Sequence, residues 1–515
     1  MGNYRGARKT TFGFPAREAP SQLTAARVTP TLGWTPIPEQ LAPLGSTTSG
    51  QNFWIRDGRL QLRERYALYG TTNLLQDAAT GAWTYLSSNG TEYPMAASQS
   101  TIVYHTGSDW THLRYSTSPT DDALSGTSQN AVFATSAYLP RLDANVMLAV
   151  NGKDRPFVWQ GPDRATGSGD TNAYSTLSGS PPIATDITYY DLRPVLWNTQ
   201  DPSTSTRYVT RMQWPVRGDA EDWTGIGSGQ EDLVEMRGTG TRIFAMGNRF
   251  LLASDRELWI AAEQEAPWVF QYTPLTKEYG MPFPRAALQI PQGVVWLNND
   301  YMVYLFDGQQ ISPIGAAIHR KLRATLKTFG TVTFGYHAGT RQVTLYYENA
   351  TQQRGFTYNF DNQTWMPQQY PAYQTATFAP IVSNARTEGF ISSNGTAYSF
   401  STSALTDSGT TMSADLVLPG FFSDTPDRSK YVDEWRLNYT TNSASSLSVS
   451  ISMDGGASYT YDAKDALKSS SDVTQLKIYP NISGLYGTLR LQCEDQGTWE
   501  LQDFYIRARV QGEGF

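Results

Sequence analysis

The chain has 515 residues, a net charge of −7 at neutral pH and 17% charged residues, whereas globular proteins average about 25%. Its 43 glycines, 28 prolines and 13% aromatic residues favour short strands joined by turns, which excludes a long helical protein. The 30 tyrosines, 21 phenylalanines and 14 tryptophans can bury enough apolar surface to exclude disorder over most of the chain. We therefore predict an all-β protein.

Cysteine content and hydropathy bear on the cellular compartment. Cys493 is the only cysteine, which excludes an intrachain disulfide framework and a cysteine-rich zinc site. No run approaches the ~18 consecutive apolar residues of a membrane helix, and no apolar signal-peptide core follows the basic N-terminus. We expect a chain made in the cytoplasm, without membrane insertion.

Residues 1–44 show neither a helical nor a strand period, and we interpret them as an extended N-terminal arm or, alternatively, as a frayed terminus. The first 30 residues carry five basic side chains against Glu18 alone, a balance of +4 that leaves −11 for the remainder. The basic arm is suited to docking on another molecule. The acidic remainder argues against nonspecific binding of nucleic acid, because phosphate affinity comes from lysine and arginine.

Residues 45–410 consist of short β runs that end at turn dipeptides. One example is the series 242–246, 249–254 and 257–262, which Gly247-Asn248 and Asp255-Arg256 separate. A Ser-Ser-Asn-Gly-Thr hairpin occurs in residues 86–93 and again in residues 391–398. Four-stranded units repeated every ~40–50 residues indicate a β-propeller, here with about six to eight blades. All-β proteins of other kinds also reuse Asn-Gly hairpins, and that alternative stays open.

Two further elements follow from periodicity. A helix is expected over residues 316–329, with an apolar face that includes Ile318 and Leu322. In residues 411–515 apolar and polar positions alternate strictly, as in the run from Leu447 to Met453. Strands with one solvated face over about 105 residues predict a C-terminal β-sandwich.

The familiar catalytic motifs are absent from the sequence. We find no nucleophile elbow, no phosphate-binding glycine loop and no zinc-enzyme spacing among the four histidines, which are His105, His112, His319 and His337. Residues 452–459 resemble the Asp box of sialidases, in which the aspartate (here Asp454) accepts backbone hydrogen bonds within a hairpin, a structural role. We therefore predict no catalytic, cofactor-binding or metal-binding residues, no cofactor and no enzymatic activity.

Residues 214–315 show an ordered series of turn signatures. It begins at Trp214-Pro215, passes through residues 218–223, 240–261 and 268–282, and closes at residues 305–308 and 311–315. This series resembles the β-propeller hub, nozzle or tail-stabilisation proteins of tailed, chiefly short-tailed, bacteriophages. The sandwich, with Asp454-Gly455-Gly456 and residues 487–492, is similar to the domain that follows the propeller in that family.

The resemblance implies a structural protein of the virion tail, assembled in the bacterial cytoplasm. It implies a sixfold homo-oligomeric ring below the portal and adaptor proteins, with tail fibre, spike or tip proteins attached below. DNA would pass through transiently without specific binding. Two alternatives remain open: a propeller–sandwich module that recognises carbohydrate or a host receptor, and a polysaccharide-degrading propeller enzyme.

Overall fold

The structure is a computed structural model of the chain. It describes residues 23–30, 32–36, 42, 46–70, 75, 77–115, 124–164, 170–264, 269–326, 332–348, 353–370, 374–378, 381–382, 385–386, 388–392, 394–418, 429–441, 445–454, 456–459, 461–467, 470–493 and 499–510. Within these ranges no helix is long and apolar enough to cross a membrane.

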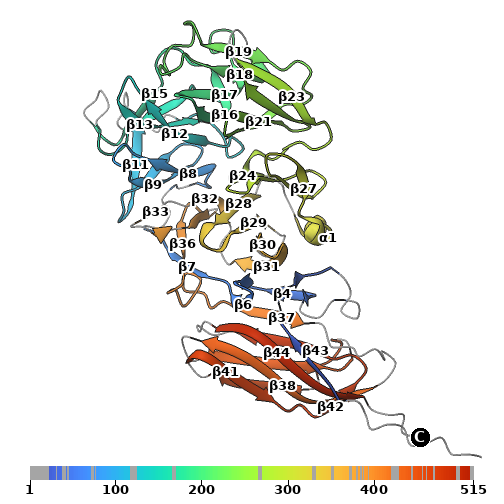
Figure 1. Cartoon of the computed structure of the whole chain (residues 1–515). Helices are drawn as coiled ribbons and strands as arrows, with labels where there is room; N and C mark the ends of the chain where they lie inside the picture. Colours follow the sequence, from blue (N-terminus) through green and yellow to red (C-terminus); the bar gives the residue numbers. More distant parts are fainter. Residues whose placement is uncertain are drawn as a thin grey trace, which may run out of the picture.

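The described ranges between residues 65 and 401 form seven four-stranded antiparallel units, which we call blades 1 to 7 (Figure 1). Blades 1 and 2 are also joined into one eight-stranded sheet, because Arg114 and Tyr115 pair in parallel with Ala173 and Tyr174. The strands are, for blade 1, β8 (Gly81–Leu86), β9 (Glu92–Ala97), β10 (Ile102–His105) and β11 (Trp110–Tyr115); for blade 2, β12 (Phe133–Leu139), β13 (Ala144–Val150), β14 (Phe157–Trp159) and β15 (Ala173–Thr176); for blade 3, β16 (Ile183–Tyr190), β17 (Arg193–Gln200), β18 (Arg207–Trp214) and β19 (Gly229–Asp232); for blade 4, β20 (Gly240–Met246), β21 (Arg249–Ser254), β22 (Leu258–Glu263) and β23 (Phe270–Thr276); for blade 5, β24 (Ala287–Ile290), β25 (Gly293–Leu297), β26 (Val303–Phe306) and β27 (Ile311–Pro313); for blade 6, β28 (Thr333–His337), β29 (Gln342–Glu348), β30 (Gln353–Asn359) and β31 (Thr364–Tyr370); and for blade 7, β32 (Gln374–Phe378), β35 (Gly389–Ser392), β36 (Ala397–Ser401) and β7 (Arg65–Leu68).

The blades close into a ring. Seven separate clusters of buried side chains lie between successive blades in the described structure, and the last of them joins blade 7 back to blade 1 through Ile391 and Val103. Blade 7 is completed from the N-terminal side, because β7 pairs with β36 and places Ala67 opposite Ser399. The prediction of a propeller with six to eight blades is confirmed, and the number is seven.

Two sheets pack face to face to form the sandwich, which lies below the blades in Figure 1. The first sheet runs in the order β41 (Ser470–Ile478), β38 (Lys430–Thr441), β44 (Trp499–Val510), β6 (Arg59–Leu62) and β5 (Phe53–Arg56), with β42 (Ile482–Gly484) on β38 and β1 (Leu23–Val28) on β44. The second runs in the order β4 (Ser49–Gln51), β37 (Ala414–Leu418), β43 (Thr488–Cys493), β39 (Ser445–Ser452) and β40 (Tyr461–Leu467). The predicted alternation is confirmed, since Leu447, Val449 and Ile451 are buried in the core between the sheets.

The structure differs from the predicted domain boundaries at the N-terminal end. Strands β4, β5 and β6 belong to the sandwich, so the first propeller strand is β7 and not a strand at residue 45. The reason is that Phe53 and Ile55 alternate as a propeller strand would, yet pack into the sandwich core. Part of the predicted arm also differs, because β1 pairs along β44 with Ala26 opposite Ile506. Residues 1–22 of the predicted arm lie outside the described residues.

Polar side chains of blade 6 tie the sandwich to the propeller. The amide groups of Gln342 and Asn359 both donate to the Ile55 carbonyl oxygen, at 2.9 and 2.6 Å. Gln368 donates to the Phe53 carbonyl oxygen at 2.7 Å. All three amide side chains are buried, so these backbone carbonyl groups of β5 form their hydrogen bonds with the propeller and not with water. The two domains therefore form one packed unit.

The predicted helix is present as α1 (Ala316–Thr325). Ile318 and Leu322 are buried between blades 5 and 6, as the apolar periodicity predicts. Residues 327–329 of the predicted range lie outside the described residues.

Candidate functional site

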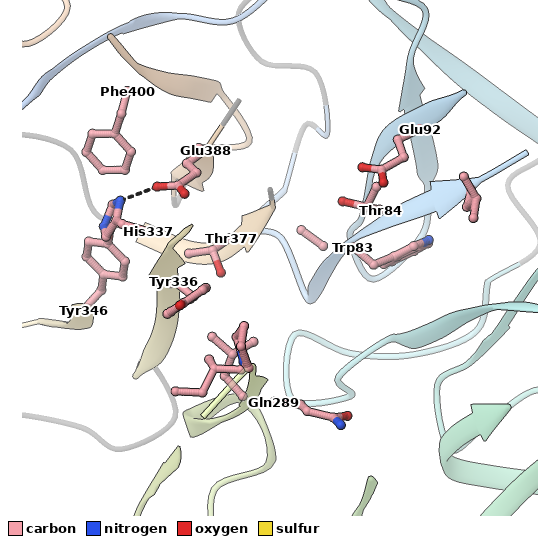
Figure 2. Close-up of a pocket in the computed structure, with 17 residues that line it drawn as sticks. Trp83, Thr84, Glu92, Gln289, Tyr336, His337, Tyr346, Thr377, Glu388 and Phe400 are labelled. Atoms are coloured by element: carbon pink, nitrogen blue, oxygen red, sulfur yellow. Dashed lines mark hydrogen bonds and ion pairs between the residues drawn. The ribbon is translucent and has the colours of Figure 1, made fainter. Parts of the chain in front are cut away.

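A cavity of about 680 Å³ lies where strands of blades 1, 5, 6 and 7 face one another (Figure 2). Four of the lining strands, β8, β24, β28 and β32, are the first strands of their blades. The cavity therefore lies on the inner side of blades 1, 5, 6 and 7, where side chains from distant parts of the sequence meet. Concave sites of this size are where proteins bind small molecules and peptide segments.

Aromatic side chains face each other across this central cavity. Figure 2 shows Trp83, Thr84 and Glu92 on one side, with Tyr336, Thr377 and Glu388 on the other. Trp83 and Tyr336 are both only partly buried, so part of each side chain remains accessible.

A histidine–carboxylate pair forms one wall. The His337 Nδ1 atom lies 2.6 Å from Glu388 Oε2, and the backbone N–H of Ala338 donates to the other carboxylate oxygen at 2.5 Å. When the carboxylate is ionised it only accepts hydrogen bonds, and the Nδ1 atom is then the donor of this pair. The His337 Nε2 atom lies 3.1 Å from the Thr344 hydroxyl oxygen. The Glu388 carboxylate is thus held in a defined orientation at the edge of the cavity.

The same wall adjoins the domain junction. The ring of Trp54, on sandwich strand β5, lies 5.2 Å from the His337 ring. Burial raises the pKa of Glu64, which lies in the link between sandwich and propeller, and the Glu388 carboxylate also raises it, whereas His337 and Arg56 lower it. The cavity wall and the junction therefore lie within electrostatic range of each other.

The lining of the cavity is acidic. Of the residues that the structure describes, Glu92 and Glu388 contribute two carboxylates to the lining, and no lysine or arginine lines it. Among these described lining side chains, His337 is the one that can carry a positive charge. The central cavity therefore disfavours phosphates and other anions and favours neutral or cationic ligands.

The sequence singled out several residues that the structure places elsewhere. His105 stacks on Tyr69 at 4.1 Å, and His319 contacts the Asp300 carbonyl oxygen at 2.8 Å. In the described ranges, no group of three histidine, cysteine or acidic residues is placed to hold a metal ion.

Asp454 of the Asp box accepts the Ser458 N–H at 2.9 Å and the Ser452 hydroxyl at 2.6 Å, and hydrogen bonding lowers its pKa to about 2. This geometry is the turn that the sequence predicts, within the sandwich and away from the cavity.

Sequence reasoning named His337 only as one of four histidines without zinc-enzyme spacing, and it missed the other cavity residues. Glu388 follows His337 by 51 positions and comes from another blade, so no motif joins them. The only available signal was the presence of Trp83 and Tyr336 within strand runs, and buried core aromatics give the same signal.

Comparison of the sequence with protein-family models and with curated proteins finds no match. Among solved structures, the chain is similar to an exo-β-1,3-galactanase from Phanerochaete chrysosporium with galactose, at 8% identity and a TM-score of 0.23, covering 66% of this chain and 98% of that one. It is also similar to YCF48 bound to D1 peptide, at 9% identity and a TM-score of 0.37, covering 66% and 98%. A third is a glycoside hydrolase family 43 arabinoxylan arabinofuranohydrolase from Bacillus subtilis, at 9% identity and a TM-score of 0.24, covering 89% and 95%.

These comparisons correct the prediction that the chain is not an enzyme. Two of the three structures are glycoside hydrolases, so the absence of a sequence motif does not set this chain apart from enzymes. The physical reason is that carboxylates from separate blades can line one cavity without any fixed spacing in the sequence, as Glu92 and Glu388 do from blades 1 and 7. At these identities and scores the likeness assigns no activity to this chain.

Proposed function

We propose that the chain is a structural protein of a tailed-phage virion, in which identical copies form a ring, sixfold by the family resemblance. In this proposal the ring continues the DNA channel below the portal and adaptor proteins and carries fibre, spike or tip proteins. The sequence signatures of residues 214–315 and of the sandwich support it. The net charge of −11 beyond residue 30 suits a conduit, because an acidic surface does not hold DNA in transit.

The observation that carries this proposal is the buried polar junction between propeller and sandwich. Gln342, Asn359 and Gln368 bind the backbone of β5, and Met366 of blade 6 enters the sandwich core. A closed ring requires each subunit to present its two contact surfaces at a fixed angle, because an error in that angle gives open filaments. A rigid two-domain subunit meets this requirement, whereas domains on a flexible link do not.

The test is the assembly state of the full-length chain. Native mass spectrometry and electron microscopy at about 10 μM should detect a ring of identical subunits, or a ring that forms on addition of the portal–adaptor complex of the same phage. A monomer under both conditions contradicts the proposal. A matched variant is Gln368→Leu, which removes one junction hydrogen bond at similar volume and should lower the yield of rings more than the folded fraction.

A further inference from the structure

We infer that the central cavity is a docking site for a basic peptide segment, and that its occupant is the N-terminal segment of a second copy of this chain. The inference rests on the proposed function, since it supplies a contact between neighbouring subunits of the ring. It names an interaction that neither the fold nor the family resemblance assigns.

Charge is the first argument. Among the described residues, the lining contributes Glu92 and Glu388 and no lysine or arginine, and His337 and Glu388 engage each other. Behind the wall, Glu64 forms an ion pair with Arg56 at 3.6 Å, so it adds no net charge to the site. Residues 1–22 hold Arg5, Arg8, Lys9 and Arg17 against Glu18, a balance of +3. This basic balance complements the acidic lining of the cavity.

Shape and surface chemistry are the second argument. A volume of about 680 Å³ holds several amino-acid side chains but not a folded domain. Trp83 and Tyr336 expose aromatic surface to the cavity, and arginine guanidinium groups bind both to aromatic faces and to carboxylates. An arginine side chain entering between Trp83 and Glu92 would use both contacts at once.

The third argument is the length of the N-terminal segment. The described structure begins at β1, and 22 residues precede it, which span at most about 75 Å when extended. The last basic residue of the first 30, Arg27, is held on the sandwich by Asp503 at 2.6 Å. This ion pair fixes Arg27 on the sandwich of its own subunit, and the proposal places the preceding basic residues on a neighbour.

The experiment uses a labelled synthetic peptide of residues 1–22 and the full-length chain with Arg5, Arg8, Lys9 and Arg17 changed to glutamine, so that its own segment does not compete. Fluorescence anisotropy should show binding that Glu92→Gln weakens about tenfold, because a charge-assisted contact is lost. Trp83→Phe should weaken binding less, and a peptide with its basic residues changed to glutamine should not bind. Raising salt from about 50 mM to about 500 mM should weaken binding of the wild-type peptide.

The matched control is Glu235→Gln, an exposed carboxylate in the segment between blades 3 and 4 and outside the described lining of the cavity, which should leave binding unchanged. Thermal unfolding of both variants checks that neither loses the fold. Equal peptide affinity in Glu92→Gln and Glu235→Gln overturns the inference. So does displacement of the peptide by neutral oligosaccharides, which would identify a carbohydrate site instead.

The ring measured on the same proteins separates this inference from the proposed function. Rings without Glu92-dependent peptide binding refute the docking site and leave the proposed function standing. Glu92-dependent binding without rings supports the docking site and refutes the ring.

Discussion

Arg63 and Asp407 form a buried ion pair across 344 positions of the sequence, with Arg63 Nη1 3.0 Å from Asp407 Oδ1. Their side chains are 0% and 1% exposed. Arg63 also donates from Nε to the Asn52 side-chain oxygen and from Nη2 to the Gln369 carbonyl oxygen, so it joins the sandwich, the link to the propeller and blade 6. The pair lies where the chain enters the propeller and where it leaves.

The ion pair predicts a large effect of neutralising one partner. Asp407→Asn leaves the Arg63 charge buried without compensation, and we expect the free energy of unfolding to fall by about 3 kcal/mol or more. Chemical denaturation followed by tryptophan fluorescence measures this change. The control is Asp361→Asn, whose ion pair with Arg341 is more than half exposed on both sides and should cost less than about 1 kcal/mol. Equal losses in the two variants would show that the buried pair has no special role.

Tyr370 predicts sensitivity to alkaline pH. Burial raises its pKa to about 12, as does the nearby Asp407, while Arg63 acts in the opposite direction. The pKa of Tyr370 in the folded protein lies above its ordinary value of about 10. The stability that the protonated side chain contributes is therefore complete below pH 10, and it is lost as the pH rises from about 10 towards 12. Denaturant titrations across this range should show a falling free energy of unfolding, with a shallower fall in Tyr370→Phe. An unchanged slope in the phenylalanine variant would contradict the assignment.

Gly179 lies between blades 2 and 3, where an added side chain would clash with the backbone. Its φ is +79°, and an added Cβ atom would lie 1.6 Å from the Glu221 carbonyl oxygen. Gly179→Ala must therefore displace backbone, and we expect a loss of about 3 kcal/mol from steric and conformational strain together. Gly247→Ala is the matched control, because its φ is +63° but nothing lies within 4 Å of the new atom. It should cost only about 1 kcal/mol in the same denaturation assay.

Tyr66 lies on β7, the strand that closes the ring, and its removal tests that closure. It is 1% exposed and packs edge-on against Phe390 at 5.0 Å and Tyr398 at 5.3 Å. Tyr66→Ala should lower the free energy of unfolding by about 3–5 kcal/mol, because it leaves a cavity between blades 6 and 7. Leu68→Ala on the same strand is the control, since Leu68 is 43% exposed. If both variants unfold at the same denaturant concentration, β7 does not close the ring as the structure has it.

The repeated Ser-Ser-Asn-Gly-Thr segment forms the same local turn at two different positions in the fold. Both copies form hairpins, in which Ser87 and Ser392 donate to the asparagine two residues later. The first hairpin joins the first and second strands of blade 1, whereas the second joins the second and third strands of blade 7. The repeat therefore identifies a turn and not an equivalent position in a blade.

By itself, the sequence determined the features that depend on neighbours along the chain. Alternation and turn residues predict the strands, the hairpins, the sandwich around Leu447 and the helix at Ile318, because these follow from local backbone geometry and the burial of one face. The approximate size of a blade predicts a propeller. The scarcity of charge and the basic start of the chain are likewise properties of composition.

Tertiary structure alone decided which sheet each strand joins. Phe53 and Ile55 alternate like a blade strand but belong to the sandwich, and β7 completes a blade that lies more than 300 residues further along the chain. The tertiary structure also decided which residues line the central cavity, since Trp83, His337 and Glu388 come from three different blades. Such convergence is set by the closure of the ring over long sequence separations, and no local period records it.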